Sequence, residues 1–330
     1  MDWEDLTRKR IRKVLRNNRV GNIRQLESKI SEAGPPRMRV MPDLITKALK
    51  ELVNEKIIFK KVIDSDLKEE LTFYLAEDFN PNSKEDSEKF NKTTTLYQKY
   101  LKIVNDQKYC GDVLEEIVLK TLEAAGYYSF IGGPSEKTDH RLVNGKKIDG
   151  NFDFILFSKN NLEIIGVEVK NKRKWIYPDS KDVWVMIDRC INNKSLPIIV
   201  ARKFPYFARN IFKVIGILGY ETHNQFFHPS LEDDMKEIKA KDGLGFADIR
   251  FTNNPEDRHV KFFKETVPKQ EEYYRNIFYS NCDILSKYSH KLKEDIPSST
   301  RNSIFFNFLR EIGLVINYTD YPDDYYHDYY

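Results

Sequence analysis

Two apolar segments in the middle of the chain carry charged residues at positions where a buried strand normally has only apolar ones. Residues 151–157 are Asn-Phe-Asp-Phe-Ile-Leu-Phe, and residues 162–170 are Leu-Glu-Ile-Ile-Gly-Val-Glu-Val-Lys. Both have the β-branched and aromatic content of strands, and Asn160-Asn161 supplies the turn of a hairpin between them. We therefore predict two antiparallel strands that are largely buried yet contain ionisable side chains.

The ionisable residues of this strand pair are Asp153, Glu168 and Lys170. Residues i and i+2 of a strand point to the same face, so Glu168 and Lys170 project together, and Asp153 on the paired strand reaches the same place. Buried charges are costly unless they are paired or bind a metal. Two carboxylates held close repel each other, and a hard divalent cation such as Mg²⁺ or Mn²⁺ relieves that repulsion. The pattern predicts a metal site at the end of these strands.

The surrounding sequence alternates between helical and strand patterns in the order α-β-β-β-α-β-α-β. The first of these helices ends at Gly126, a residue typical of the position after a helix C-terminus, and it can add a third carboxylate from Glu115 or Glu116. Beside the hairpin, we predict helices over residues 112–125, 181–193 and 206–215, and strands over residues 127–131, 196–201 and 217–220.

Asp153 followed by Glu168-Val169-Lys170, with an acidic helix that contains Gly111 and Glu115 before them, resembles the PD-(D/E)XK nuclease superfamily. The resemblance covers about residues 109–225. This superfamily includes type II restriction enzymes, Holliday-junction resolvases and transposon end-cleaving nucleases, and the helix pattern is most similar to the resolvase-type branch. Phe152 stands where the motif has proline, at a position that varies within the superfamily. The resemblance implies an α/β chain with a restriction-endonuclease-like αβββαβ core.

The resemblance also implies a role for each matching residue. Asp153 and Glu168 would ligate Mg²⁺ or Mn²⁺, with the main-chain carbonyl of Val169 as a further ligand. Glu115 would hold a metal or its water from the helix. Lys170 would orient or deprotonate the attacking water and offset charge on the phosphorus. The implied activity is a Mg²⁺-dependent endodeoxyribonuclease that leaves a 5′-phosphate and a 3′-hydroxyl.

Simpler interpretations of the same residues stay open. Glu168 and Lys170 are also compatible with an ordinary ion pair on an exposed edge strand, and Asp153 with a residue that caps a turn. Asp149 is a rival for the role of Asp153 because it also precedes the strand, and Glu163 is a weaker rival. We prefer Asp153 because an apolar run follows it at once, as in the superfamily pattern.

The N-terminal residues have the pattern of three helices followed by a β-hairpin. This order resembles the winged helix-turn-helix family, whose third helix enters the major groove while the hairpin lies along the DNA backbone. The expected helices are residues 6–16, 22–32 and 42–54, and the expected strands are residues 56–63 and 71–75. By this resemblance the DNA-binding residues are Arg37, Arg39, Lys47, Lys50, Lys60 and Lys61.

The formal net charge is only +3, but basic residues are unevenly distributed. Residues 8–61 contain 16 Lys and Arg against 5 Asp and Glu, and residues 170–213 contain 11 against 3. Two basic blocks indicate two surfaces for a polyanion. A charge run is equally typical of an ordinary solvated face.

The segment after Lys170 is basic and has aromatic residues interleaved, a composition suited to holding phosphates and stacking on bases. The alternative is that Trp175 and Tyr177 pack on the helix that follows. The candidate DNA contacts here are Asn171, Lys172, Arg173, Trp175, Tyr177, Arg202 and Arg209, and we place Arg189, Lys203 and Tyr206 among further residues that line the cleft.

We divide the chain into five parts on these patterns. They are a winged-helix-like domain over residues 1–80, a linker helix over 81–108, a nuclease-like domain over 109–225, a helical C-terminal region over 226–318 and an acidic, Tyr-rich tail over 319–330. Three widely spaced cysteines without a CxxC pair argue against a disulfide framework or a structural zinc site.

The expected function is a metal-dependent DNA endonuclease of a restriction, defence or mobile-element type. The chain has no apolar run long enough to span a bilayer and no secretory signal, so we expect a cytoplasmic protein without a membrane partner. We expect a homodimer, because two facing sites cut the two strands of a duplex. The alternatives are a catalytically inactive nuclease-fold DNA-binding regulator or scaffold, and an RNA-directed nuclease.

Overall fold

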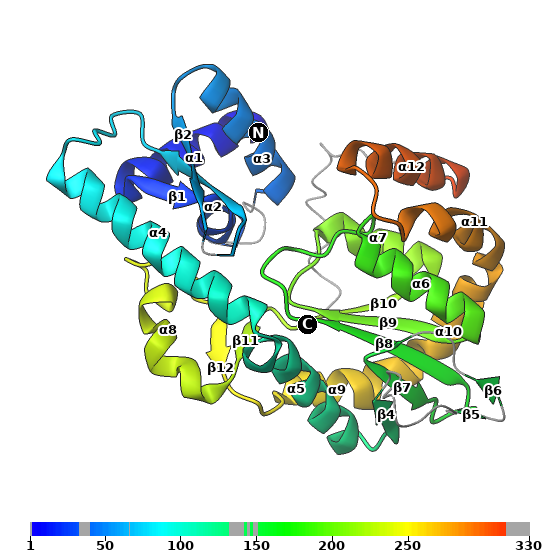
Figure 1. Cartoon of the computed structure of the whole chain (residues 1–330). Helices are drawn as coiled ribbons and strands as arrows, with labels where there is room; N and C mark the ends of the chain where they lie inside the picture. The colour runs from blue at the N-terminus through cyan, green and yellow to red at the C-terminus, as the bar shows by residue number, and fades with distance from the viewer. Residues whose placement is uncertain are drawn as a thin grey trace. The chain divides into compact units, whose positions relative to one another are not determined.

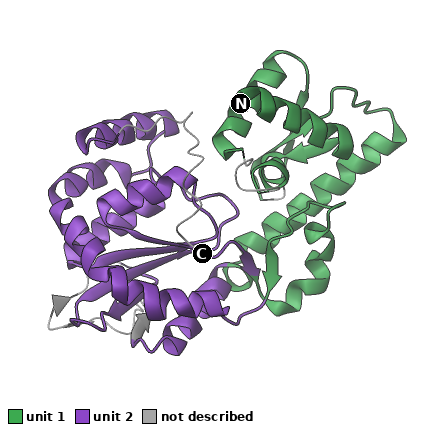
Figure 2. Cartoon of the chain, turned by 180° about the vertical axis from the view of Figure 1, so that it is seen from behind, with its two compact units in different colours: residues 1–110, 227–251, 323–330 green, residues 111–226, 252–322 purple. Residues whose placement is uncertain are grey.

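The computed structural model describes residues 2–32, 40–65, 67–131, 142–143, 146–147 and 151–314. The chain is of mixed α/β class and forms two compact units, shown in different colours in Figure 2. Among the described residues, unit 1 holds those up to Cys110 together with Phe227–Phe251, and unit 2 holds those of Gly111–Phe226 together with residues 252–314.

Unit 1 begins with three helices and a three-stranded antiparallel sheet in the order β1-β3-β2. The helices pack around a core that includes Ile11, Leu26 and Leu49, all fully buried. Two N-termini are fixed by side chains: Asp2 accepts hydrogen bonds from Glu4 and Asp5 N–H groups, and Asn22 forms a capping box with Gln25. The elements are α1 (Trp3–Asn18), β1 (Val20–Asn22), α2 (Ile23–Ile30), α3 (Pro42–Asn54), β2 (Phe59–Asp64) and β3 (Glu70–Leu75).

A second core in unit 1 joins the long helix α4 (Lys84–Asn105) to residues that come much later in the chain. Tyr100 of α4 contacts the Phe246 ring at a centroid distance of 5.0 Å, and both side chains are buried. The later segment contains the 3₁₀ turn Pro229–Leu231, α8 (Glu232–Lys239) and β12 (Ile249–Phe251). The strand β11 (Gln225–Phe227) begins before this segment and ends at its first residue.

Unit 2 is built on a five-stranded mixed sheet in the order β10-β9-β8-β7-β4. β8 pairs with β7 as an antiparallel hairpin and with β9 in parallel, and β9 pairs in parallel with β10. Figure 1 shows α6 and α7 on one face of this sheet and α5, α9 and α10 on the other. The elements are α5 (Gly111–Ala124), β4 (Ser129–Ile131), β7 (Phe154–Phe157), β8 (Ile164–Lys170), α6 (Lys181–Asn193), β9 (Leu196–Ala201), α7 (Tyr206–Ile215), β10 (Leu218–Glu221), α9 (Asp257–Lys261), the π-helical segment Phe262–Thr266, α10 (Val267–Ser280), α11 (Cys282–Leu292) and α12 (Ser298–Glu311).

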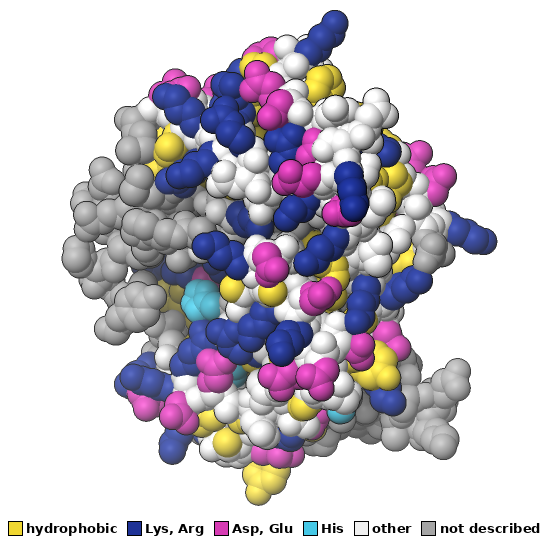
Figure 3. All heavy atoms as spheres, turned by 90° about the vertical axis from the view of Figure 1, so that its left-hand side faces the viewer, with side chains coloured by type: hydrophobic (Ala, Val, Ile, Leu, Met, Phe, Trp, Pro, Cys, Tyr) yellow, Lys and Arg dark blue, Asp and Glu magenta, His cyan; other side chains and the backbone are white. Residues whose placement is uncertain are grey.

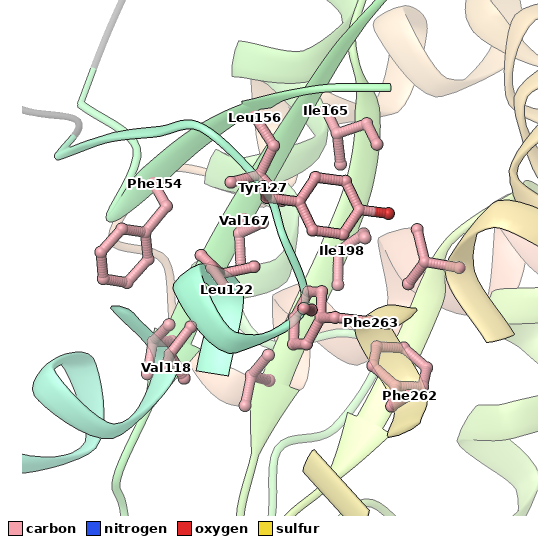
Figure 4. Packing of buried hydrophobic residues seen from close by; sticks show 14 of the residues in the cluster. Val118, Leu122, Tyr127, Phe154, Leu156, Ile165, Val167, Ile198, Phe262 and Phe263 are labelled. Atoms are coloured by element: carbon pink, nitrogen blue, oxygen red, sulfur yellow. The ribbon is translucent and has the colours of Figure 1, made fainter. Parts of the chain in front are cut away.

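Apolar side chains fill the space between the sheet and the helices α5 and α10. Figure 4 shows strand residues such as Val167 and Ile198 packed against Leu122 of α5 and against Phe263. Residues of β8 alternate between this core and the opposite face, where a Cβ on Gly166 would meet the Phe152 ring at 2.4 Å and Cys190 Sγ of α6 at 3.2 Å. The central strands are therefore buried on both faces, which accounts for their apolar content.

The structure divides the chain differently from the sequence in two places. The linker helix expected over residues 81–108 is α4 and belongs to unit 1. The helical region expected over residues 226–318 is split, since residues 227–251 lie in unit 1 and the described residues from 252 lie in unit 2. The strand expected over residues 56–63 is β2, which begins only at Phe59, and the acidic tail 319–330 lies outside the described residues.

Candidate active site

The predicted pair on β8 lies together at the C-terminal end of that strand. Glu168 is 5% exposed, and its Oε1 lies 2.5 Å from Lys170 Nζ. The even-numbered residues of β8 face away from the α5 core, so both side chains project to the α6 side of the sheet. A short ion pair in this buried position is the structural centre of the site.

Asp153 completes this group, although it is not part of a strand as predicted. β7 begins one residue later, at Phe154. At Asp153 a side-chain hydrogen bond takes the place of a main-chain one between the strands, because Asp153 Oδ2 accepts a hydrogen bond from the main-chain N–H of Val169 at 2.6 Å. The pairing of Phe154 with Val167 brings Asp153 beside the end of β8, and its Oδ2 lies 3.7 Å from Lys170 Nζ. Lys170 thus contacts both carboxylates.

The charges of this group also affect the pKa of Glu115 on α5. Burial, followed by the negative charges of Asp153 and Asp112, raises the pKa of Glu115 to about 7. Its neighbour Glu116 is engaged elsewhere, because its Oε1 accepts from Asn253 Nδ2 at 3.0 Å and pairs with Lys120 Nζ at 2.7 Å. Of the two candidates on this helix, Glu115 is the one that interacts with the Asp153 group.

Arg189 of α6 is a member of the site that the sequence did not connect with Glu168. Its Nη1 lies 3.3 Å from Glu168 Oε2, and it also donates a hydrogen bond to the carbonyl of Asn151. Glu168 is therefore held between two cations, Lys170 and Arg189. The basic residue in the helix after the Glu-x-Lys strand was the available signal, but only the packing of α6 on β8 pairs it with Glu168.

Burial and charge act in opposite directions on the central pair. Burial is the largest influence on Glu168 and raises its pKa, with Lys170 opposing that shift. Burial alone would lower the pKa of Lys170, but Glu168 and Asp153 outweigh it, so the pKa of Lys170 is raised. Lys170 therefore holds its proton firmly, and Glu168 depends on its cationic neighbours to stay ionised.

The two rivals of Asp153 do not join this group among the described residues. Glu163 lies before β8, at the turn of the hairpin, where its Oε2 pairs with Arg275 Nε at 2.7 Å. Asp149 lies outside the described residues. Of Asp153 and its rivals, Asp153 is thus the one that the described structure places against Lys170.

The site contains the type of donor atom that a hard divalent cation prefers, but the donor atoms are not arranged around one common point. Carboxylate oxygens of Asp153, Glu168 and Glu115 are the ligands that Mg²⁺ and Mn²⁺ prefer. Val169 has an apolar side chain without donor atoms, so this residue could contribute only its main-chain carbonyl. Within the described part of the chain, no three His, Cys, Asp or Glu side chains are placed to hold a metal ion together, and Lys170 occupies the position between Asp153 and Glu168.

Four residues that we expected to contact DNA are buried. Asn171, Arg173, Trp175 and Arg202 are 8%, 6%, 8% and 1% exposed. Arg202 Nη2 donates to the carbonyl of Arg173 at 2.6 Å, and Asn171 Nδ2 donates to the carbonyl of Phe226 at 2.6 Å. These polar groups fix the loop after β8 from inside, so this basic block is less exposed than its composition indicates.

The other candidates of this block remain nearer to solvent. Lys172 is exposed and its Nζ lies 2.5 Å from Asp182 Oδ2, and Arg209 is exposed and pairs with Glu221. Tyr177 is half-buried and its ring lies 6.2 Å from that of Phe207. The alternative placed both aromatic residues on α6, the helix that follows the loop. The ring contact of Tyr177 is instead with Phe207 of α7, and Trp175 is buried.

Part of the basic block of unit 1 is engaged within the protein. Lys47 forms an ion pair with Glu4, and Lys61 Nζ lies 4.2 Å from the centroid of the Phe90 ring. Figure 3 shows Lys and Arg side chains interspersed with Asp and Glu on the face it draws. Lys50 and Lys60 are exposed, whereas Arg37 and Arg39 lie outside the described residues.

Comparisons with known proteins give no relative for this chain. No family model, no curated protein and no solved structure matches it. Across the described residues, no helix combines the length and the apolar character needed to cross a lipid bilayer. The functional argument therefore rests on the geometry of the site.

Proposed function

We propose that the protein is a metal-dependent endodeoxyribonuclease of the PD-(D/E)XK type. The observation that carries this proposal is the convergence of Asp153, Glu168 and Lys170 at one end of a mixed sheet, with Glu115 close enough for its pKa to respond to Asp153. When only the strands of the five-stranded sheet are counted, leaving out the separate short pair β5 (Leu142–Val143) and β6 (Lys146–Lys147), the order α5-β4-β7-β8-α6-β9 is compatible with the αβββαβ core of that superfamily. A hairpin followed by two parallel strands places the ends of β8 and β9 at one edge, where open α/β sheets bind ligands.

Each residue has a role that its environment supports. Asp153 and Glu168, with the carbonyl of Val169, would hold Mg²⁺ or Mn²⁺, and Glu115 would hold the ion or its water. The bound ion would polarise the phosphoryl oxygen and offset its developing charge. Lys170, whose pKa is raised, is suited to orient the attacking water and to stabilise negative charge as a cation, and poorly suited to remove a proton.

A metal held by Asp153 and Glu168 would share these carboxylates with Lys170, whose Nζ lies within 3.7 Å of both. Arg189, at 3.3 Å from Glu168, would keep that carboxylate oriented. The ammonium group of Lys170 would supply positive charge beside the substrate phosphate.

We assign DNA binding to unit 1 as a winged helix. Three helices, a three-stranded sheet and the exposed edge strand β2 agree with that family. All four lysines proposed from sequence on the expected recognition helix and wing are exposed, namely Lys47 and Lys50 on α3 and Lys60 and Lys61 on β2. Lys47 pairs with Glu4 and Lys61 lies over the Phe90 ring, so Lys50 and Lys60 are the pair chosen for substitution. A homodimer would place two sites on one duplex and allow cleavage of both strands.

Replacing both Lys50 and Lys60 by Gln is expected to weaken binding to duplex DNA and to reduce the slope of log K against log salt by about 2, because each removed cation releases about one counterion fewer. Fluorescence anisotropy over a range of salt concentrations measures this slope. The matched control is Lys89→Gln with Lys92→Gln, two exposed lysines on α4 of the same unit. An equal loss in both double variants would contradict the assignment of α3 and β2.

A second candidate is favoured by one observation. Two cations already neutralise Glu168, as they would in a nuclease fold that has become a DNA-binding scaffold without a metal. Such a protein binds DNA with no metal requirement and does not cleave it. An assay that follows both binding and cleavage separates this candidate from the enzyme.

The direct test is plasmid cleavage in Mg²⁺ or Mn²⁺, with EDTA as the negative control and matched DNA and RNA substrates. We expect wild-type protein to nick or linearise DNA and Glu115→Gln to lose about tenfold or more of that rate. Glu116→Gln is the matched control, because Glu116 belongs to the same helix but pairs with Lys120. Cleavage of RNA alone would favour the RNA-directed alternative, and DNA binding without cleavage would favour the scaffold.

A further inference from the structure

Unit 1 contains a hollow of about 590 Å³ whose lining includes no residue of α3, of β2 or of the proposed nuclease site. It is lined by residues of α1 and α2 and by residues of the α8–β12 segment, and all of these belong to unit 1. Its volume falls in the range of small-molecule sites, roughly 300–1,000 Å³. The question is which chemistry its lining would recognise.

Three lysines contribute to the lining, namely Lys29, Lys239 and Lys241. Lys29 Nζ donates to Asn18 Oδ1 at 3.0 Å and to the carbonyl of Lys241 at 3.3 Å, so it is fixed on the wall of the hollow. Burial and then the positive charge of Lys241 lower the pKa of Lys29. An anion between these lysines would stabilise the charged form of Lys29 and would offset both the effect of burial and the repulsion from Lys241.

The loop opposite Lys29 is shaped to admit this ammonium group. Gly245 has φ +75°, and a Cβ built there would lie 2.9 Å from Lys29 Cε and 3.4 Å from Nζ. Ser28 Oγ of α2 also donates to the carbonyl of Gly245 at 3.3 Å. The close approach keeps the α2 end of the hollow and the Gly245 loop in a defined arrangement.

The remaining lining is chemically mixed. Val14 and Ala247 provide apolar surface, while Glu32 and Asp248 provide carboxylates. Ammonium groups recognise phosphate, a carboxylate recognises the hydroxyl groups of a ribose, and apolar surface accepts the face of a base. A nucleoside phosphate combines these three features in one molecule of suitable size, whereas inorganic phosphate uses only the lysines.

We propose that this hollow is a binding site for a small nucleoside phosphate. The phosphate lies by Lys29, Lys239 and Lys241, and the sugar and base lie toward the carboxylate and apolar part of the lining. The proposal is independent of the nuclease function, because it uses other residues in the other unit.

Isothermal titration calorimetry on the full chain tests the proposal with AMP, ADP and ATP, and with inorganic phosphate and adenosine as partial ligands. We expect nucleotides to bind more tightly than either partial ligand. Lys239→Gln and Lys241→Gln are each expected to weaken nucleotide binding by roughly tenfold, the loss of one charge-assisted contact. Lys236→Gln, an exposed lysine of α8 outside the lining, is expected to bind like wild type.

A substitution of Lys29 would also remove a contact between α2 and the α8–β12 segment, so the Lys239 and Lys241 variants carry the test. Binding that is unchanged in the Lys239→Gln, Lys241→Gln double variant would overturn the proposal, as would the absence of binding at millimolar nucleotide. Nucleotide binding that disappears in Lys170→Met but persists in the double variant would locate the ligand at the nuclease site and would also overturn it. Adenosine binding as tightly as ATP would exclude phosphate recognition.

Discussion

Lys170→Met is expected to reduce Mg²⁺-dependent DNA cleavage by roughly 100-fold or more at saturating metal. Methionine keeps an unbranched stem and fills the largely buried position of Lys170, but it removes the cation that lies 2.5 Å from Glu168 and 3.7 Å from Asp153. The carboxylates then lose a competitor for the metal, so we expect cleavage to saturate at the same or lower Mg²⁺ concentration. A falling maximal rate without weaker metal dependence is the signature of a residue that acts on the reaction.

Glu168→Gln is expected to change the metal dependence of cleavage as well as the rate. The amide keeps the shape of the side chain but removes a charged metal ligand, so cleavage should saturate at a higher Mg²⁺ concentration and should stay slow at saturating Mg²⁺. Initial rates over a Mg²⁺ series distinguish the two variants. Lys213→Met is the matched control, because Lys213 is an exposed lysine near the C-terminal end of α7, before β10 begins.

Wild-type rates in Lys170→Met would contradict the assignment of this residue, and cleavage by every variant alike would point to a contaminating nuclease. Lys170→Met also changes the balance of charge around Glu168, which keeps Arg189 as its ion-pair partner among the described residues. Chemical denaturation of each variant therefore accompanies the rates, so that a loss of activity is separated from a loss of folded protein.

The central part of this site could be predicted because its pattern is local. Glu168 and Lys170 are two residues apart on one strand, and the short turn between β7 and β8 brings Asp153 to them. Strand periodicity and one hairpin are enough for that step. The exact start of β7 was missed, because the bond from Val169 N–H to the Asp153 side chain replaces a ladder bond that sequence patterns assume.

The parts that sequence could not supply depend on contacts between distant segments. Arg189 reaches Glu168 only through the packing of α6 on the sheet. Arg173 and Arg202 look like surface cations, yet a main-chain carbonyl accepts a hydrogen bond from Arg202 inside the protein. Residues 227–251 join unit 1 through aromatic contacts with α4, such as Tyr100 with Phe246. None of these contacts leaves a periodic signal in the chain.

Gly216→Ala is expected to lower the free energy of unfolding of unit 2 by about 3 kcal/mol or more. Gly216 ends α7 with φ +78°, where an L side chain is strained. An added Cβ would also lie 2.3 Å from the Phe278 nitrogen and 2.5 Å from the Tyr274 carbonyl oxygen of α10. Backbone atoms cannot turn aside as a flexible side chain can, so α7 and α10 would have to separate.

Gly126→Ala separates the cost of the backbone conformation from the cost of that clash. Gly126 also follows a helix of unit 2, with φ +79°, but the nearest atom to its built Cβ is the flexible Lys159 Nζ at 3.7 Å. We expect this variant to lose only about 1 kcal/mol. Denaturant unfolding of both variants measures the difference. Equal losses of unfolding free energy would show that α7 and α10 can separate at little cost. A much larger loss in Gly216→Ala would show that the close approach of these two backbones stabilises the packing of the helices around the sheet that carries Glu168 and Lys170.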